Sequence, residues 1–157
     1  MGALVVSHPL AQEGLRPLPP LMRTVSDEAG ILSEEEGRKL ASTIAEIFEA
    51  TGVPVILVIA ETTKPERIED YAERLAKRWR ERRGLDPTRA VMIVVSIGDR
   101  EMQVMPGSTL RSLDIALQRE ELTRDIAPLF REARYSKGLV LLLGRIRSVL
   151  EQSGPAR

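Results

Sequence analysis

The stretch VSDEAGILS at residues 25–33, followed by EEEGRKL, decides how this chain of 157 residues begins its fold. Ser33 followed three residues later by Glu36 is a capping box. The serine hydroxyl accepts the amide of the third helical residue, and the glutamate reaches back to the serine amide. The spacing therefore predicts a short acidic loop, with Asp27 and Glu28, that leads into a helix. Negative charge is favoured beside that helix end, and ligands often bind such loops.

Downstream, the chain alternates between helical and extended patterns. Helices are predicted where apolar residues recur at a spacing of three to four residues, at 34–51, 64–83, 110–117, 122–130 and 139–150. Thr63 and Glu66 predict a second capping box at the start of the second helix. Glycine follows each of the first two helices, at Gly52 and Gly84, and ends it.

Strands are predicted where the apolar run is almost unbroken, which is typical of strands covered on both faces. These runs are residues 53–60 and 91–97; Gly98-Asp99 then turns the chain into an alternating edge strand at 100–105. The element order predicts an α/β fold, a three-layer α/β/α sandwich with a small mixed β-sheet flanked by helices. The crossover between the two apolar strands is expected to be parallel and right-handed.

The chain divides into an N-terminal arm, residues 1–24, and one domain, residues 25–153. Pro17, Pro19 and Pro20 favour an extended, flexible arm. Within it, the apolar stretch 3–12 ends in small residues, like the remnant of an export signal, although no basic segment precedes it. A flexible terminus is the alternative interpretation. No apolar run reaches the length of a membrane span, so a membrane anchor is expected only in a longer gene product.

Composition excludes several classes of function. Formal net charge is zero, which disfavours nucleic acid as a partner, and there is no cysteine for a disulfide or a thiolate zinc site. His8, the one histidine, lies in the arm, which disfavours a histidine-based triad. The basic run at 77–83 contains Trp79 on the buried stripe of its helix, so no nucleic-acid site is predicted there. Absent asparagine and abundant arginine suit a thermophile, and a GC-rich genome explains the arginine equally well.

Acidic residues gather at one predicted edge of the sheet. Glu61 follows the first apolar strand, Asp99 follows the second, and the loop with Asp27 and Glu28 lies at the same edge. Ligands bind beyond the carboxyl ends of parallel strands, and hard oxygen ligands suit Ca²⁺ or Mg²⁺. The alternative is that these side chains only cap turns. A further set of arginines on the late helices forms either a solvated face or a docking surface for an acidic partner: Arg124, Arg131, Arg134, Arg145 and Arg147.

The order and spacing of short motifs resemble the TPM domain family. The matching pieces are V-x-D-x-A-G-x-L-S at 25–33, T-G at 51–52, Y-A at 71–72 with Trp79, D-R at 99–100, Gly107, L-D at 113–114, P-x-F at 128–130 and Y-x-x-G-L at 135–139. The resemblance implies an α/β/α sandwich in an exported, periplasmic or membrane-tethered protein. It implies an acidic pocket for calcium or another divalent cation, and carries Asp27, Asp99 and Asp114 over as motif residues. Asp114 joins the pocket only if residues 108–114 return to the acidic edge.

Two departures weaken that cation site. The chain has G-S-T-L-R at 107–111, where members often have Gly-x-Gly-Leu-Glu, and Arg134 stands where an acid often precedes the tyrosine. Some plant members of the family are described as acid phosphatases, and an animal member is an auxiliary protein of a receptor channel. Two functions are therefore expected: an accessory module with a protein partner in the cell envelope and a weak Ca²⁺ or Mg²⁺ site, or a metal-assisted phosphatase acting on phosphomonoesters.

Overall fold

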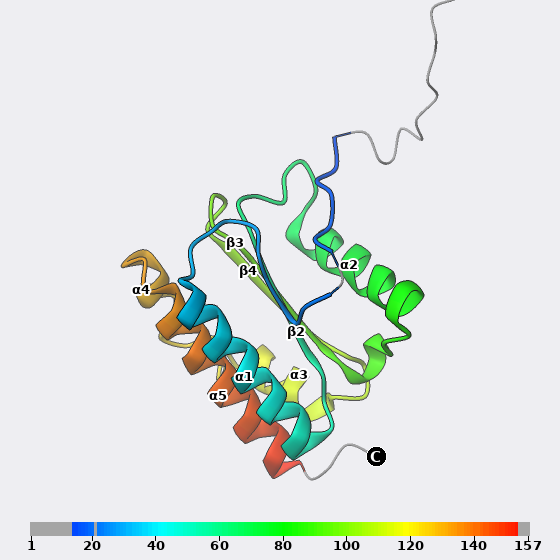
Figure 1. Cartoon of the computed structure of the whole chain (residues 1–157). Coiled ribbons are helices and arrows are strands. Elements are labelled where there is room, and N and C mark those ends of the chain that lie inside the picture. The colour runs from blue at the N-terminus through cyan, green and yellow to red at the C-terminus, as the bar shows by residue number, and fades with distance from the viewer. Residues whose placement is uncertain (1–13, 21, 154–157) are drawn as a thin grey trace, which may run out of the picture.

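The computed structural model describes residues 14–20 and 22–153, so the expected signal remnant at 3–12 lies outside the described residues. Its architecture is the predicted α/β/α sandwich (Figure 1). The elements in chain order are β1 (Val25–Asp27), α1 (Glu34–Thr51), β2 (Val55–Ala60), α2 (Ile68–Arg83), the 3-10 turn η2 (Pro87–Arg89), β3 (Val91–Ser96), β4 (Glu101–Pro106), α3 (Arg111–Gln118), α4 (Ile126–Arg131) and α5 (Tyr135–Gln152).

The four strands form one mixed sheet in the order β1-β2-β3-β4. β1, β2 and β3 are parallel, and β4 runs antiparallel to β3 through the predicted hairpin. The prediction that residues 25–27 form a loop is wrong, because they form the strand β1. Its three residues are too few to show a strand pattern, and they become a strand because β2 offers an open edge. Glu28 N donates to the Ile59 carbonyl (2.8 Å), and Leu57 N donates to the Thr24 carbonyl (2.7 Å).

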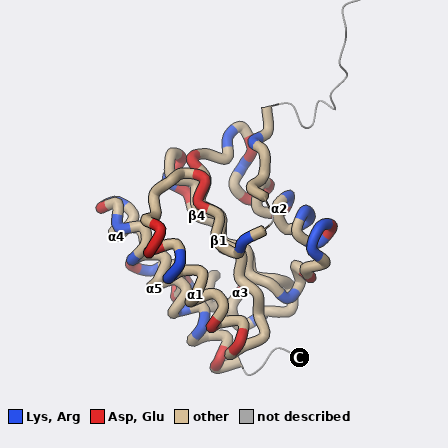
Figure 2. Tube along the Cα trace, in the orientation of Figure 1, with Lys and Arg blue, Asp and Glu red and all other residues tan. Residues whose placement is uncertain are grey.

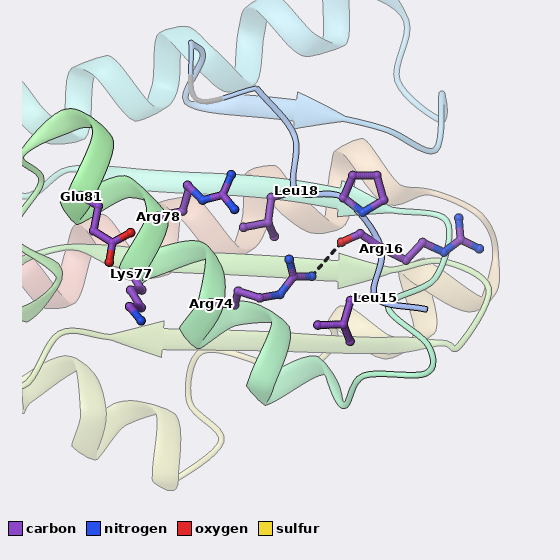
Figure 3. Close-up of a pocket in the computed structure, with 8 residues that line it drawn as sticks. Leu15, Arg16, Leu18, Arg74, Lys77, Arg78 and Glu81 are labelled. Atoms are coloured by element: carbon purple, nitrogen blue, oxygen red, sulfur yellow. Dashed lines mark hydrogen bonds between the residues drawn. The ribbon is translucent and has the colours of Figure 1, made fainter. Parts of the chain in front are cut away.

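Helices cover both faces of the sheet, which explains the unbroken apolar runs in β2 and β3. On one face, Leu57 and Ile93 belong to a core with α1, α3 and α5; on the other, Val58 and Val94 pack against α2. The β2-α2-β3 crossover is right-handed, as predicted (Figure 3). β1, β2 and β3 follow one another across the sheet in chain order, but α1 lies on the face opposite to α2. The β1-α1-β2 crossover is therefore left-handed, which is rare.

Of the two capping boxes predicted at helix starts, one forms and the other does not. α1 has the predicted capping box: Glu36 N donates to Ser33 Oγ (3.1 Å), and Ser33 N donates to Glu36 Oε1 (2.9 Å). The second box does not form, because α2 begins at Ile68 without a side-chain cap. Thr63 Oγ1 instead donates to the Glu66 carbonyl (3.2 Å), and the Glu66 carboxylate pairs with a helix residue farther along.

The part of the arm that the structure describes lies against α2. Residues 14–20 have no regular secondary structure, as the proline content predicts. Pro19 is nevertheless buried, and Leu18 packs against the core on the α2 side. Arg74 Nη2 donates to the Arg16 carbonyl (2.8 Å). Within the described part of the chain, no helix is long and apolar enough to cross a membrane.

Candidate functional site

The acidic edge of the sheet exists as predicted. β1, β2 and β3 all end there, with Asp27 beside Ile59 and Ala60 beside Ser96. Asp27, Glu61 and Asp99 therefore share one edge, and acidic residues mark this end of the molecule in Figure 2. Because β2 separates β1 from β3, the strand axes that lead to the two aspartates are about 10 Å apart.

Asp27 holds the loop between β1 and α1. Its Oδ1 accepts the amide of Gly30 (2.8 Å), and its Oδ2 accepts the amide of Leu32 (2.8 Å). Gly30 adopts φ 68°, a left-handed conformation that costs glycine little. Both carboxylate oxygens of Asp27 thus satisfy backbone donors immediately before the Ser33 cap, so this residue determines how the chain enters α1.

Asp99 is the centre of a buried hydrogen-bond cluster. Its Oδ2 accepts from Ser96 Oγ (2.6 Å), Thr62 Oγ1 (2.7 Å) and Thr63 N (3.2 Å), and Lys64 Nζ lies 3.6 Å from Oδ1. The side chain is only 7% exposed. The Ser96 hydrogen bond lowers the pKa of Asp99 most, followed by the Thr62 bond; with smaller contributions from Thr63 and Lys64, they outweigh burial and bring the pKa to about 2.

These carboxylates do not fit a divalent-cation site. Calcium takes six to eight oxygen ligands, and magnesium demands near-octahedral geometry. Both oxygens of Asp27 bind backbone amides, and Oδ2 of Asp99 already has three donors. Glu28 and Glu61 are exposed at the same edge. Among the described residues, no group of three histidine, cysteine or acidic side chains is arranged to hold a metal ion.

Asp114, which the resemblance placed in the same pocket, lies elsewhere. β4 returns the chain to the opposite edge, where Gly107 N donates to the Ala90 carbonyl (2.8 Å) and Thr109 N donates to the Thr88 carbonyl (3.0 Å). These bonds hold residues 107–109 at the start of β3, so α3 begins there and the chain does not return to the acidic edge. The exposed Asp114 carboxylate accepts from Gln118 Nε2 (3.1 Å). The structure brings Asp27 and Asp99 to one edge and leaves Asp114 at the other.

The residues that donate hydrogen bonds to Asp99 were not predicted from the sequence. Thr62 and Thr63 lie more than thirty residues before Asp99, and no local pattern connects them. Ser96 offered a signal, because it is the one polar residue in the β3 run VMIVVS and it is buried. A hydroxyl in such a position needs a partner, and the nearest acceptor along the chain is Asp99.

A second candidate region, which was not predicted from the sequence, lies on the α2 side. A groove of about 500 Å³ separates residues 15–18 from α2 (Figure 3). Leu15 and Leu18 line it from the arm; Arg74, Lys77 and Arg78 line it from the helix. Basic residues are frequent along α2 in Figure 2. This groove therefore combines apolar and cationic side chains.

Comparisons with known proteins agree with this fold. A sequence model of the TPM domain matches residues 25–149. The N-terminal domain of a protein from P. gingivalis has a similar NMR structure, with a TM-score of 0.71 and 25% identity, over 83% of each chain. The BA42 protein from the psychrophilic Bizionia argentinensis has a TM-score of 0.67 and 16% identity, over 80% of this chain and 86% of its own.

The N-terminal domain of the cg2496 protein from Corynebacterium glutamicum is similar over 91% of each chain, with a TM-score of 0.61 and 11% identity. At such low identity, the cg2496 and BA42 likenesses concern the fold alone. None of the curated proteins matches this chain.

Proposed function

The chain belongs to the TPM domain family, and from that premise we propose that it is a non-catalytic accessory module that binds a protein partner. We place it outside the cytosol, exported or tethered to the envelope, as the family resemblance implies. The matched span of residues 25–149 covers all of the strands and most of the helices, so the proposal concerns the folded body of the chain.

The low pKa and the hydrogen-bond donors of Asp99 are the observation that carries this proposal. A general base works best when its pKa lies near the pH at which it operates. Hydrogen bonds lower the pKa of Asp99 to about 2, so this carboxylate is a very weak base at neutral pH. Three donors occupy its Oδ2, and Lys64 Nζ lies 3.6 Å from its Oδ1, so a metal ion would have to compete with these groups for the carboxylate. The acidic edge thus favours a scaffold over a metal-assisted hydrolase.

The organisation of similar proteins supports a module. The structures from P. gingivalis and C. glutamicum are each described as an N-terminal domain, which implies that further chain follows in those proteins. A domain within a longer chain is a compact unit, and its contacts with neighbouring domains resemble transient protein–protein interfaces. We extend that arrangement to this chain as part of the proposal.

The phosphatase alternative is tested by activity. The purified protein is incubated with p-nitrophenyl phosphate, with and without millimolar Ca²⁺ or Mg²⁺, and we expect no turnover. Metal-dependent turnover that disappears in Asp99→Asn, in a variant shown to be folded by circular dichroism, would replace the accessory module with the hydrolase.

The weak cation that the resemblance implies is tested by thermal unfolding. A ligand that binds only the folded state raises the midpoint of unfolding. We expect no change with millimolar Ca²⁺ or Mg²⁺. A midpoint that rises in the wild type but not in Asp27→Asn would show that the acidic edge binds the ion.

The binding role is tested by affinity capture. The immobilised protein is exposed to an envelope fraction of the source cells, crosslinked and analysed by mass spectrometry, and a purified version of each captured protein is then titrated by calorimetry. Saturable binding of one of them is the expected result. No saturable binding by any captured protein would contradict the accessory role.

A further inference from the structure

We propose that the groove between residues 15–18 and α2, called here the α2 groove, binds an extended protein segment that carries several carboxylates. This inference names the chemistry of the partner and rests on the proposed accessory function. The groove lies over the face of the sheet that α2 covers, so it is separate from the acidic edge. The groove has fixed walls, cations without a carboxylate partner among the described residues, and apolar side chains.

The walls of the α2 groove are held in place by Arg74. Its guanidinium pairs with the Glu66 carboxylate (2.9 Å) and donates to the Arg16 carbonyl (2.8 Å). It also lies over the Tyr71 ring, with 5.5 Å between the guanidinium carbon and the ring centroid. These contacts join the arm to the helix before any ligand arrives, and such preorganisation lowers the entropic cost of binding.

The other cations of the groove are not neutralised by any carboxylate in the part of the chain that the structure describes. Arg16, Lys77 and Arg78 are exposed, and no carboxylate of the described residues forms a salt bridge with any of them. Glu81 is the one acidic side chain that lines the groove. Since Glu66 neutralises Arg74, the α2 groove keeps an excess of positive charge, which complements a partner with several carboxylates.

Three of the five arginines on the late helices already pair with carboxylates, and only Arg124 and Arg131 form no salt bridge among the described residues, so this surface is the weaker docking surface by the same criterion. Arg134 pairs with Glu132 (3.5 Å), and Arg145 pairs with Asp125 (3.3 Å). Arg147 pairs with the carboxylates of Glu151 (2.5 Å) and Glu46 (3.6 Å). An incoming acidic segment would have to displace these partners, whereas the cations of the α2 groove are available.

The arrangement of side chains favours an extended segment over a single small anion. In Figure 3, Arg78 extends toward Leu18, while Lys77 leaves α2 on the other side. Cations that point in different directions cannot converge on one phosphate. They can bind successive carboxylates of an extended chain, and Leu15 and Leu18 offer contacts to apolar residues between them.

Two other occupants fit the groove less well. Nucleic acid is favoured by cations interleaved with exposed aromatic side chains, but Trp79 of α2 is buried in the core. The chain's own residues 1–13 contain a single acidic residue, Glu13, and therefore offer little charge to complement three cations.

The test uses a fluorescein-labelled glutamate-rich peptide with interspersed leucines, and the readout is fluorescence anisotropy with the full chain. The variant Lys77→Gln/Arg78→Gln removes two groove cations. The matched control Arg80→Gln/Arg82→Gln removes two exposed cations from the same helix outside the groove. We expect the groove variant to bind about fivefold more weakly, from two partly exposed ion pairs, and the control to bind like the wild type. Binding must also weaken as salt is added.

Several results would overturn the α2 groove as this site. An equal loss of affinity in both variants would show that only the overall charge of α2 matters. Stronger binding of a lysine-rich peptide, inorganic phosphate or single-stranded DNA would assign another ligand class. Tighter peptide binding after deletion of residues 1–13 would identify that segment as the natural occupant.

The groove and the accessory role fail in different ways. If the partner identified by capture binds Lys77→Gln/Arg78→Gln as tightly as it binds the wild type, the groove assignment is wrong and the accessory function stands. If no captured protein binds saturably while the glutamate-rich peptide still distinguishes the two variants, the accessory function fails and the anionic-segment site stands.

Discussion

Replacing Asp99 by asparagine tests the buried cluster at the acidic edge most directly. Asparagine has nearly the shape of a protonated aspartate, so Asp99→Asn imitates loss of the charge without opening a cavity. The folded-state pKa is about 2, against an ordinary value of 3.8. At 1.36 kcal/mol per pKa unit, the charge stabilises the fold at neutral pH by about 2 kcal/mol. We expect Asp99→Asn to lose about that amount.

The pH dependence of this stability loss shows whether the charge of Asp99 causes it. Because the pKa of Asp99 is lower in the folded state, its contribution is complete above the unfolded pKa and is lost as pH falls through the folded pKa. The difference in unfolding free energy between wild type and Asp99→Asn should therefore be about 2 kcal/mol at pH 7 and should shrink toward zero between about pH 5 and pH 2.

Urea unfolding followed by circular dichroism, at a series of pH values, measures this difference. Asp86→Asn is the matched control, because Asp86 is exposed and its pKa is lowered by hydrogen bonds from the neighbouring Thr88. We expect a smaller effect there. A difference for Asp99→Asn that stays constant from pH 7 to pH 2 would refute the assignment of a low pKa to this carboxylate.

Three further substitutions test the fold. Ser33→Ala removes the hydroxyl that accepts Glu36 N, so urea unfolding should show a loss of about 1 kcal/mol; no loss would mean that the box does not stabilise α1. Gly107→Ala would place a Cβ 2.3 Å from the Thr88 carbonyl carbon, so we expect a loss of about 2 kcal/mol or more by calorimetry, and a wild-type midpoint would contradict this close approach. Ile93→Ala opens a cavity in the fully buried core and should cost about 3 kcal/mol, whereas a loss below about 1 kcal/mol would place Ile93 outside a tightly packed region.

The elements that the sequence predicted are those whose cause is local. α1 has the predicted bounds because its apolar stripe lies within it, and its capping residue Ser33 and the left-handed Gly52 lie immediately before and after it. β2 and β3 were recognisable because strands covered on both faces lose almost all polar residues. Alternation of residues on opposite faces then determined which core each side chain joins.

The features that the sequence did not predict depend on distant partners. β1 is a strand because residues 25–27 meet the edge of β2. Thr63 looked like a helix cap, but its amide binds Asp99 and its hydroxyl binds the Glu66 carbonyl. Neither arrangement leaves a periodic pattern, since a single pairing at a distance imposes no repeat on its neighbours.

The sequence by itself determined the sandwich, its parallel core and the edge at which acidic residues gather. Only the tertiary structure decided that Asp27 and Asp99 would be used as acceptors for backbone and hydroxyl donors, and that residues 15–18 would form a cationic groove with α2. The physical reason is that apolar burial is encoded by residue type along one segment. The role of a carboxylate or a guanidinium depends instead on which donors and charges other segments bring within a few ångströms of it.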